Sequence, residues 1–296
     1  MSNTPTTIEN DTRLRGTRWW AEVGWKHVFA VVFVIGFCLL PLLYVLSASL
    51  NPGGTLTGSN RLFTTFSMEN YQSLLNTNFP RWIVNSFVVS GASAIGTVVM
   101  AAAAAYAFSR FRFMGRRGGL TALLIIQMFP QMLAFVAIFL LLLTIGEVYP
   151  WLGIGSHLNL IMVYLGGALG ANTFLMYGFF NTIPEELDEA AKIDGATHAQ
   201  IFWGIVMRLV TPILAVVGLL SFVATYGEFI LARIILPRSE DYTLAVGLYV
   251  WASDERNAPW ALFAAGAVIA AIPIIALFMF LQKYIASGLT AGGVKG

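Results

Sequence analysis

The side chains that most often carry chemistry are few in this sequence and lie far apart. Its three histidines are His27, His157 and His198, and its single cysteine is Cys38. None of them has the short spacing to another that brings metal ligands together, and one cysteine forms no disulfide framework. We therefore expect no metal site, and we interpret Cys38 as a small residue within an apolar segment.

The lysines give no sign of nucleotide hydrolysis. A chain that hydrolyses ATP needs a glycine-rich loop ending in Gly-Lys-Ser or Gly-Lys-Thr, because that loop holds the phosphates. The four lysines are Lys26, Lys192, Lys283 and Lys295, and none has this context. The sequence also lacks the clustered nucleophile, acid or metal set of a membrane enzyme. We predict a chain that is not an enzyme and that binds no cofactor itself.

Glu228 is the acidic residue that interrupts an otherwise apolar run. Ionisable residues inside a membrane often mark ion or proton pathways, and an ion-coupled secondary transporter needs such sites near the midplane. Glu228 instead lies toward one end of its run and close to Arg233, so we expect it to be paired or to lie at the outer mouth. An ion-coupled transporter therefore remains a remote alternative.

A polar segment, residues 182–208, reads as two short helices separated by a glycine. Pro184 suits the first position of the first helix, and Gly195 suits a left-handed stop at its end. Acidic residues favour the first turn of a helix because they complement its dipole. Four of them follow the proline: Glu185, Glu186, Asp188 and Glu189.

A second helix is predicted directly after this glycine. Thr197 is followed three residues later by Gln200, which is a capping-box pattern, and apolar residues come next. Two helices around a glycine turn would form a compact knob with Ala190 and Ala191 on a surface of small residues. We expect this knob to fit a groove on another protein.

The remainder of the chain has the composition of a membrane protein. Hydrophobic residues make up 57% of the 296 residues and charged residues 11%, whereas a soluble domain has about 25% charged residues. A membrane-spanning helix needs about 20 apolar residues. Six runs meet this requirement, approximately at residues 28–50, 83–108, 120–145, 158–180, 209–232 and 261–281. The predicted fold class is therefore all-α, with six transmembrane helices.

Basic residues predict the orientation of these helices. If alternate loops share a side, one side carries 12 of the 17 lysines and arginines. Four of them lie in a single short loop: Arg110, Arg112, Arg116 and Arg117. The positive-inside rule then places both termini and segment 182–208 in the cytoplasm. We divide the chain into a cytoplasmic segment 1–27, a transmembrane domain 28–284 and a cytoplasmic tail 285–296.

Segment 182–208 resembles the EAA loop of binding-protein-dependent ABC importer permeases. The resemblance rests on two triplets, Glu189-Ala190-Ala191 and Asp194-Gly195-Ala196. In that family the loop is a coupling helix that enters a cleft of the ATPase subunit and transmits its closure to the membrane helices. The resemblance thus implies a type I importer permease fold and assigns ATPase coupling to Glu189, Ala190, Ala191, Asp194 and Gly195.

One position departs from the family pattern. Many members have a proline thirteen residues after the glycine, where this chain has Arg208, although the later Pro212 matches. Arg208 is expected to extend toward the cytoplasmic end of the fifth span. The family pattern therefore does not predict the geometry of the connection between segment 182–208 and the fifth span.

Similarity to the smaller permeases of maltose and maltodextrin importers extends over almost the whole chain. It is carried by four stretches: QMFP at 127–130, YLGG at 164–167, YTLAVG at 242–247 and GLTAGGVKG at 288–296. The resemblance implies ATP-driven import of maltose or maltodextrin across the bacterial inner membrane. Trehalose and other oligosaccharides remain open, because importers of these sugars share the same architecture.

The same resemblance implies several partners and two further contact regions. The partners are a second, larger permease (MalF-like), an ATPase dimer (MalK-like) that binds ATP and Mg²⁺, and an extracytoplasmic solute-binding protein, all in a lipid membrane and without nucleic acid. The tail residues Gly292, Gly293 and Lys295 would contact the ATPase. The contact with the binding protein would involve the last outer loop, with residues Ser253, Asp254, Glu255, Arg256 and Asn257.

Overall fold

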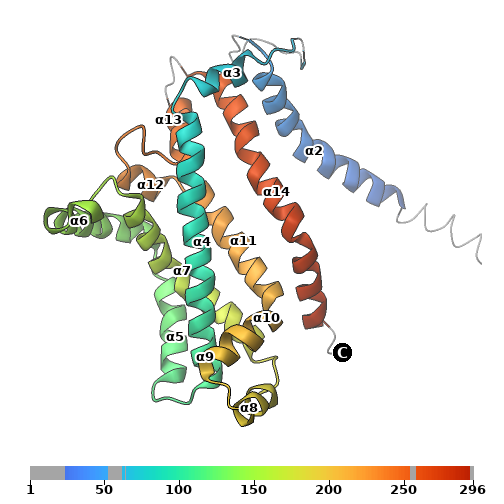
Figure 1. Ribbon diagram of the computed structural model, residues 1–296. Coiled ribbons are helices and arrows are strands. Elements are labelled where there is room, and N and C mark those ends of the chain that lie inside the picture. Colours follow the sequence, from blue (N-terminus) through green and yellow to red (C-terminus); the bar gives the residue numbers. More distant parts are fainter. Residues whose placement is uncertain (1–23, 53–61, 64, 254–257, 294–296) are drawn as a thin grey trace, which may run out of the picture.

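The computed structural model describes residues 24–52, 62–63, 65–253 and 258–293, and within them it contains helices and no strands (Figure 1). The helices are α2 (Trp25–Ser49), α3 (Glu69–Leu75), α4 (Phe79–Arg110), α5 (Arg116–Gln127), α6 (Gln131–Val148), η2 (Pro150–Leu152), α7 (His157–Phe180), α8 (Glu186–Ile193), α9 (His198–Ile201), η3 (Phe202–Val206), α10 (Met207–Leu209), α11 (Thr211–Gly227), α12 (Ile230–Ile235), α13 (Leu244–Ala252) and α14 (Trp260–Gly293). The prediction of an all-α fold is confirmed.

Four of these helices, α2, α4, α7 and α14, are long and apolar enough to cross a membrane by themselves. Two bent pairs meet the same test together, α5 with α6 and α9–α10 with α11, which gives up to six spans in the described part of the chain. The prediction of a polytopic membrane protein is therefore confirmed.

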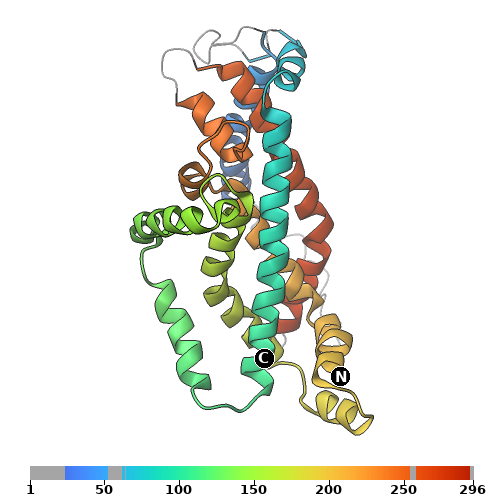
Figure 2. The same cartoon turned by 60° about the vertical axis from the view of Figure 1, so that its left-hand side comes forward.

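The expected third and fifth spans are not continuous helices. The third is bent by 97° at the α5–α6 junction, where Pro130 has an extended conformation and precedes α6. The fifth span is bent by 80° between α9–α10 and α11. Helix α11 carries Pro212 in its first turn. Proline has no amide hydrogen to donate to the carbonyl four residues earlier. Each break therefore occurs at a residue that cannot make the helical hydrogen bond. Figure 2 shows α6 lying across the direction of α4 and projecting from the bundle.

Helix α4 is the centre of the bundle and packs against α7 and α11 (Figure 1). Its middle and carboxyl-terminal part is rich in alanine, and Ala101, Ala102 and Ala105 are completely buried. Small side chains allow helix backbones to approach closely inside a membrane. The small residues of this stretch therefore form a packing surface for the neighbouring helices.

The other end of α4 contacts the segment that leads into α13. Trp82 lies at this contact and is 4% exposed. Its indole nitrogen donates a hydrogen bond to the backbone oxygen of Ser239 at 2.6 Å. The ring also packs on Gly247, where an added Cβ would lie 2.1 Å from a ring carbon. Trp82 thus joins two elements of the protein and does not face lipid.

Candidate functional site: a helical knob and a membrane cavity

Helices α8 and α9 form a compact knob beside the end of α4 that carries Arg110 (Figure 1). Helix α8 ends at Ile193, and Gly195, two residues later, has a φ of +83°. The Ala196 amide donates to the Ala191 oxygen at 2.9 Å, and the Gly195 amide donates to the Lys192 oxygen at 3.0 Å. This pair of bonds is a Schellman motif, which satisfies carbonyls at the end of a helix and favours glycine at the left-handed position.

The second helix of the knob starts with the predicted capping box. The Thr197 hydroxyl accepts from the Gln200 amide at 3.3 Å, and the Gln200 side chain accepts from the Thr197 amide at 2.7 Å. These bonds satisfy two amides that the start of a helix leaves free. The knob therefore has a defined turn geometry without any partner.

The five residues assigned to ATPase coupling divide between the surface and the interior. Glu189, Ala190, Asp194 and Gly195 are exposed. Ala191 is 9% exposed and belongs to the inner apolar cluster with Ile201 and Phe202. Four of these residues are thus available to a partner, whereas Ala191 packs the knob onto its own chain.

An ion pair that the sequence does not reveal fastens the knob to α4. The Arg110 Nε lies 2.7 Å from the Asp188 Oδ2, and both side chains are at most 6% exposed. Arg110 also donates to the Ile183 backbone oxygen at 3.1 Å. The sequence offers Asp188 as one of several acids in a first helical turn and Arg110 as one of four loop arginines, so composition alone does not distinguish them.

The hinge between knob and membrane helix contains a local widening of the helix. Residues Phe202–Val206 form a π-helix, η3, and α10 follows directly. Arg208, at the position where the family pattern has proline, is exposed. Its carbonyl oxygen and that of Met207 accept from the Thr211 hydroxyl, at 2.8 and 3.2 Å. The break then occurs before Pro212, so this later proline accounts for the bend.

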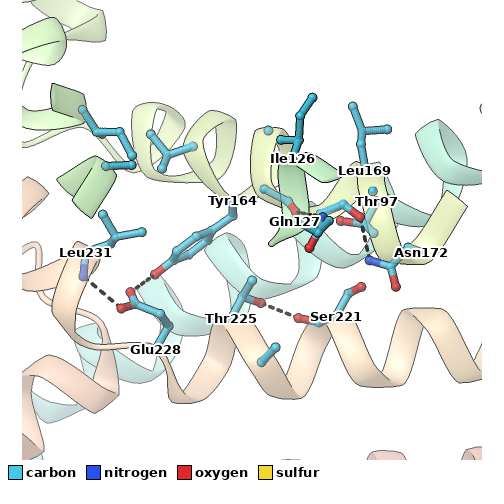
Figure 3. A pocket seen from close by; sticks show the side chains of 18 of the residues that line it. Thr97, Ile126, Gln127, Tyr164, Leu169, Asn172, Ser221, Thr225, Glu228 and Leu231 are labelled. Carbon is cyan, nitrogen blue, oxygen red and sulfur yellow. Dashed lines mark hydrogen bonds between the residues drawn. The ribbon is translucent and has the colours of Figure 1, made fainter. Parts of the chain in front are cut away.

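A second feature is a cavity of about 800 Å³ between α5, α6, α7 and α11, lined mostly by apolar side chains. Polar side chains from different helices also reach it (Figure 3), namely Thr97, Gln127, Tyr164, Asn172, Ser221, Thr225 and Glu228. Gln127 donates to the Gly167 backbone oxygen at 3.0 Å, which ties α5 to α7. The cavity has the size of a small-molecule site.

Glu228 lies at one end of this cavity and is held by three hydrogen bonds. Its Oε2 accepts from the Tyr164 hydroxyl at 2.6 Å and from the Ala232 amide at 3.1 Å, and its Oε1 accepts from the Leu231 amide at 2.9 Å (Figure 3). Those amides belong to the first turn of α12, where a carboxylate is favoured. The expected pairing with Arg233 is not seen, because the Arg233 guanidinium lies over the Tyr242 ring at 5.2 Å.

The other predicted contact residues are only partly described. Ser253 is exposed and its hydroxyl donates to the Tyr249 backbone oxygen at 2.7 Å, while Asp254, Glu255, Arg256 and Asn257 lie outside the described residues. Gly292 and Gly293 form the end of α14, and Lys295 lies outside the described residues. The part of the chain that the structure describes contains no group of His, Cys, Asp or Glu suited to a metal ion.

Comparison with known proteins gives consistent matches. Residues 97–291 match the family described as "Binding-protein-dependent transport system inner membrane component". The chain is 40% identical over 270 residues to the galactooligosaccharides transport system permease protein GanQ of Bacillus subtilis (strain 168), covering 90% of this chain and 93% of that protein. It is also 40% identical over 283 residues to the maltose/maltodextrin transport system permease protein MalG of Escherichia coli (strain K12), covering 91% and 95%.

A solved structure has the same fold. A chain from the crystal structure of a bacterial ABC transporter involved in the import of the acidic polysaccharide alginate superposes with a TM-score of 0.73. The match covers 95% of this chain and 100% of that chain, at 23% sequence identity.

Proposed function

The chain belongs to the family of binding-protein-dependent transport system inner membrane components, and from this premise we propose that it is a permease subunit of an ATP-driven oligosaccharide importer. Maltose and maltodextrins are the first candidates for its cargo. The chain would form part of the membrane path and leave ATP hydrolysis to a separate subunit.

The observation that carries this proposal is the preorganised knob of α8 and α9. Its turn is fixed by the chain's own hydrogen bonds, and it exposes Glu189, Ala190, Asp194 and Gly195 at one end of the bundle. A rigid helix turn with a small residue on its surface fits a cleft at little entropic cost, because nothing must be ordered on docking. We assign the cleft to an ATPase subunit that binds ATP and Mg²⁺.

The cavity supports a neutral sugar as the cargo. Its lining has amide and hydroxyl groups beside apolar side chains, and among the described residues that line it there is no lysine or arginine. The carboxylate present there, Glu228, is already occupied by Tyr164 and the start of α12. An acidic polysaccharide would gain no cationic partner on this wall. Maltose, maltodextrins, galacto-oligosaccharides and trehalose are all uncharged.

The remaining partners follow from family membership and from the shape of the chain. Its cavity is lined on one side by a helix, α6, that projects away from the bundle (Figure 2). We propose that a second permease of the MalF type completes the path, that an ATPase dimer of the MalK type binds the knob, and that a solute-binding protein delivers the sugar. In this arrangement the knob and both termini face the cytoplasm, as the basic loop 110–117 favours.

Transport in reconstituted vesicles tests the function. The chain would be purified with the second permease and ATPase, inserted into vesicles, and supplied with the solute-binding protein and labelled maltose, maltotriose, galactotriose, trehalose or an alginate oligomer. We expect uptake of a neutral sugar that needs both ATP and the binding protein, and no uptake of the alginate oligomer. Vesicles without the ATPase are the control.

Two results would contradict the proposal. Sugar accumulation in the vesicles without ATPase, driven by a sodium or proton gradient, would make the chain an ion-coupled transporter. Uptake of the alginate oligomer in preference to every neutral sugar would overturn the assignment of the cargo.

A further inference from the structure

Helix α4 is held to the cytoplasmic knob by buried charge at its carboxyl end. The Arg110–Asp188 ion pair is 2.7 Å long with both side chains at most 6% exposed, and the same guanidinium binds the Ile183 oxygen just before α8. Opposite charges attract strongly where water is excluded, and the hydrogen bond from the same guanidinium to the Ile183 oxygen fixes its orientation. A displacement of α8 therefore acts directly on the end of α4.

The opposite end of α4 is fastened in a similar way to the outer segment 239–244. Trp82 donates to the Ser239 oxygen at 2.6 Å, and Asn85 donates to the Glu240 and Tyr242 oxygens at 3.1 and 3.0 Å. Ser86, which is buried, accepts from the Leu244 amide at 2.7 Å. Three side chains, from two consecutive turns of α4, thus hold segment 239–244.

Between these two ends α4 is a continuous helix. It extends over 32 residues, and its proline lies in the first turn, where it does not interrupt the hydrogen bonds. The rise from Ser86 to Arg110 is about 36 Å. Its completely buried alanines leave little room for bending against α7 and α11. Such a helix moves as one body when either end is displaced.

We propose that α4 is the element that transmits movement of the cytoplasmic knob to the outer segment 239–244, with Arg110 and Asp188 as positioning residues at one end and Ser86 at the other. This inference rests on the proposed function, because it assumes that an ATPase moves the knob. Movement would then pass from one side of the membrane to the other along α4. The outer segment would then change its position in step with ATP binding.

The first test replaces the ion pair without leaving a buried charge. Removing one partner alone would strand the other, whereas replacing both by apolar residues of similar size is often neutral for stability. In the double variant Arg110→Met with Asp188→Leu, we expect the assembled complex to keep its ATP hydrolysis and its melting temperature. Uptake per ATP hydrolysed should fall about tenfold. Arg112→Met, at an exposed arginine two residues away, is the control and should resemble the native complex.

A second test asks whether the two ends of α4 act together. Ser86→Ala removes the acceptor of the Leu244 amide and should also lower uptake per ATP hydrolysed. Mutations far apart normally have independent effects that multiply. If α4 is one transmitting body, the triple variant should be little worse than the more severe of its two parents. Fold-changes that multiply would overturn the inference, and so would native uptake per ATP in the ion-pair variant.

Failure of this inference differs from failure of the proposed function. If the native complex shows no ATP-dependent, binding-protein-dependent uptake, the function itself is wrong. If the native complex and the ion-pair variant both transport normally, the proposed function is supported and the proposed role of α4 is wrong.

Discussion

The knob depends on the backbone conformation of a single residue. Gly195 has a φ of +83°, and a Cβ added there would meet nothing within 4 Å in this chain. The turn therefore selects glycine for its backbone and not for lack of space. Residues with a Cβ pay roughly 1–2 kcal/mol in this left-handed region, while asparagine adopts it more readily.

We predict a graded response at Gly195. Sugar uptake and retention of the ATPase during purification should decrease in the order Gly195→Asn, Gly195→Ala, Gly195→Val, because the strain at positive φ grows in that order. The amount of ATPase that copurifies with each variant and the initial rate of uptake measure this response.

Gly204 supplies the matched control for this series. It lies in the same segment, has open space around it and has no positive φ, so Gly204→Ala should behave like the native chain. Equal activity of the three Gly195 variants would show that the turn is not needed for coupling.

Sequence reasoning at this scale identified the turn and its caps, but not the contacts made across the fold. Gly195, Thr197 and Gln200 act on neighbours in the chain, so their spacing reveals their roles. The Arg110–Asp188 pair and the burial of Ala191 arise from the approach of α4 to the knob. No local pattern encodes which acid meets which arginine, and Ala191 therefore looked like a surface residue.

At the scale of elements, the apolar runs predicted which segments could span a membrane, but they did not predict which of these segments are bent. Hydropathy is a property of composition, and it is the same for a straight helix and a bent one. Pro130 and Pro212 mark both sharp bends, so the breaks were readable from proline chemistry but their angles were not. The break at Glu228 depends on its hydrogen bonds to the first turn of α12, which no hydropathy pattern encodes.

The contact between α4 and α13 gives a prediction about packing. The Trp82 ring packs against Gly247, and a Cβ at position 247 would lie 2.1 and 2.4 Å from ring carbons. Gly247→Ala should force the buried indole from its place and cost about 1–3 kcal/mol. The melting temperature of the purified complex in detergent should fall accordingly.

Gly178→Ala in α7 is the control for this substitution. Nothing lies within 4 Å of the Cβ it would add, and alanine favours a helix over glycine. Its melting temperature should be equal to or above that of the native complex. An unchanged melting temperature for Gly247→Ala would contradict the tight α4–α13 contact.

At the scale of the whole molecule, the basic loops predict the orientation of the chain in the membrane, and this prediction has a direct test. Met114 is completely exposed in the loop after α4, and Ser239 is exposed near the opposite end of that helix. In a Cys38→Ser background, we expect Ser239→Cys to react with a membrane-impermeant maleimide added outside cells. Met114→Cys should react only after the membrane is permeabilised.

The reverse labelling pattern would place the knob outside the cell, where no ATPase could reach it. Because α4 spans the membrane between the two labelled positions, one pair of variants reports the direction of the whole bundle. A third cysteine variant, Arg112→Cys in the same loop as Met114, should give the same result as Met114→Cys.

The two adjacent alanines of the knob have an evolutionary consequence. Ala190 is exposed on the surface that we propose binds the ATPase, whereas Ala191 is buried beside Ile201 and Phe202 of its own chain. The residue at position 191 is therefore constrained by its own chain, and the residue at position 190 by the subunit that binds the knob. Among related chains, changes at position 191 should be accompanied by changes at positions 201 and 202, and changes at position 190 by changes in the subunit that receives the knob.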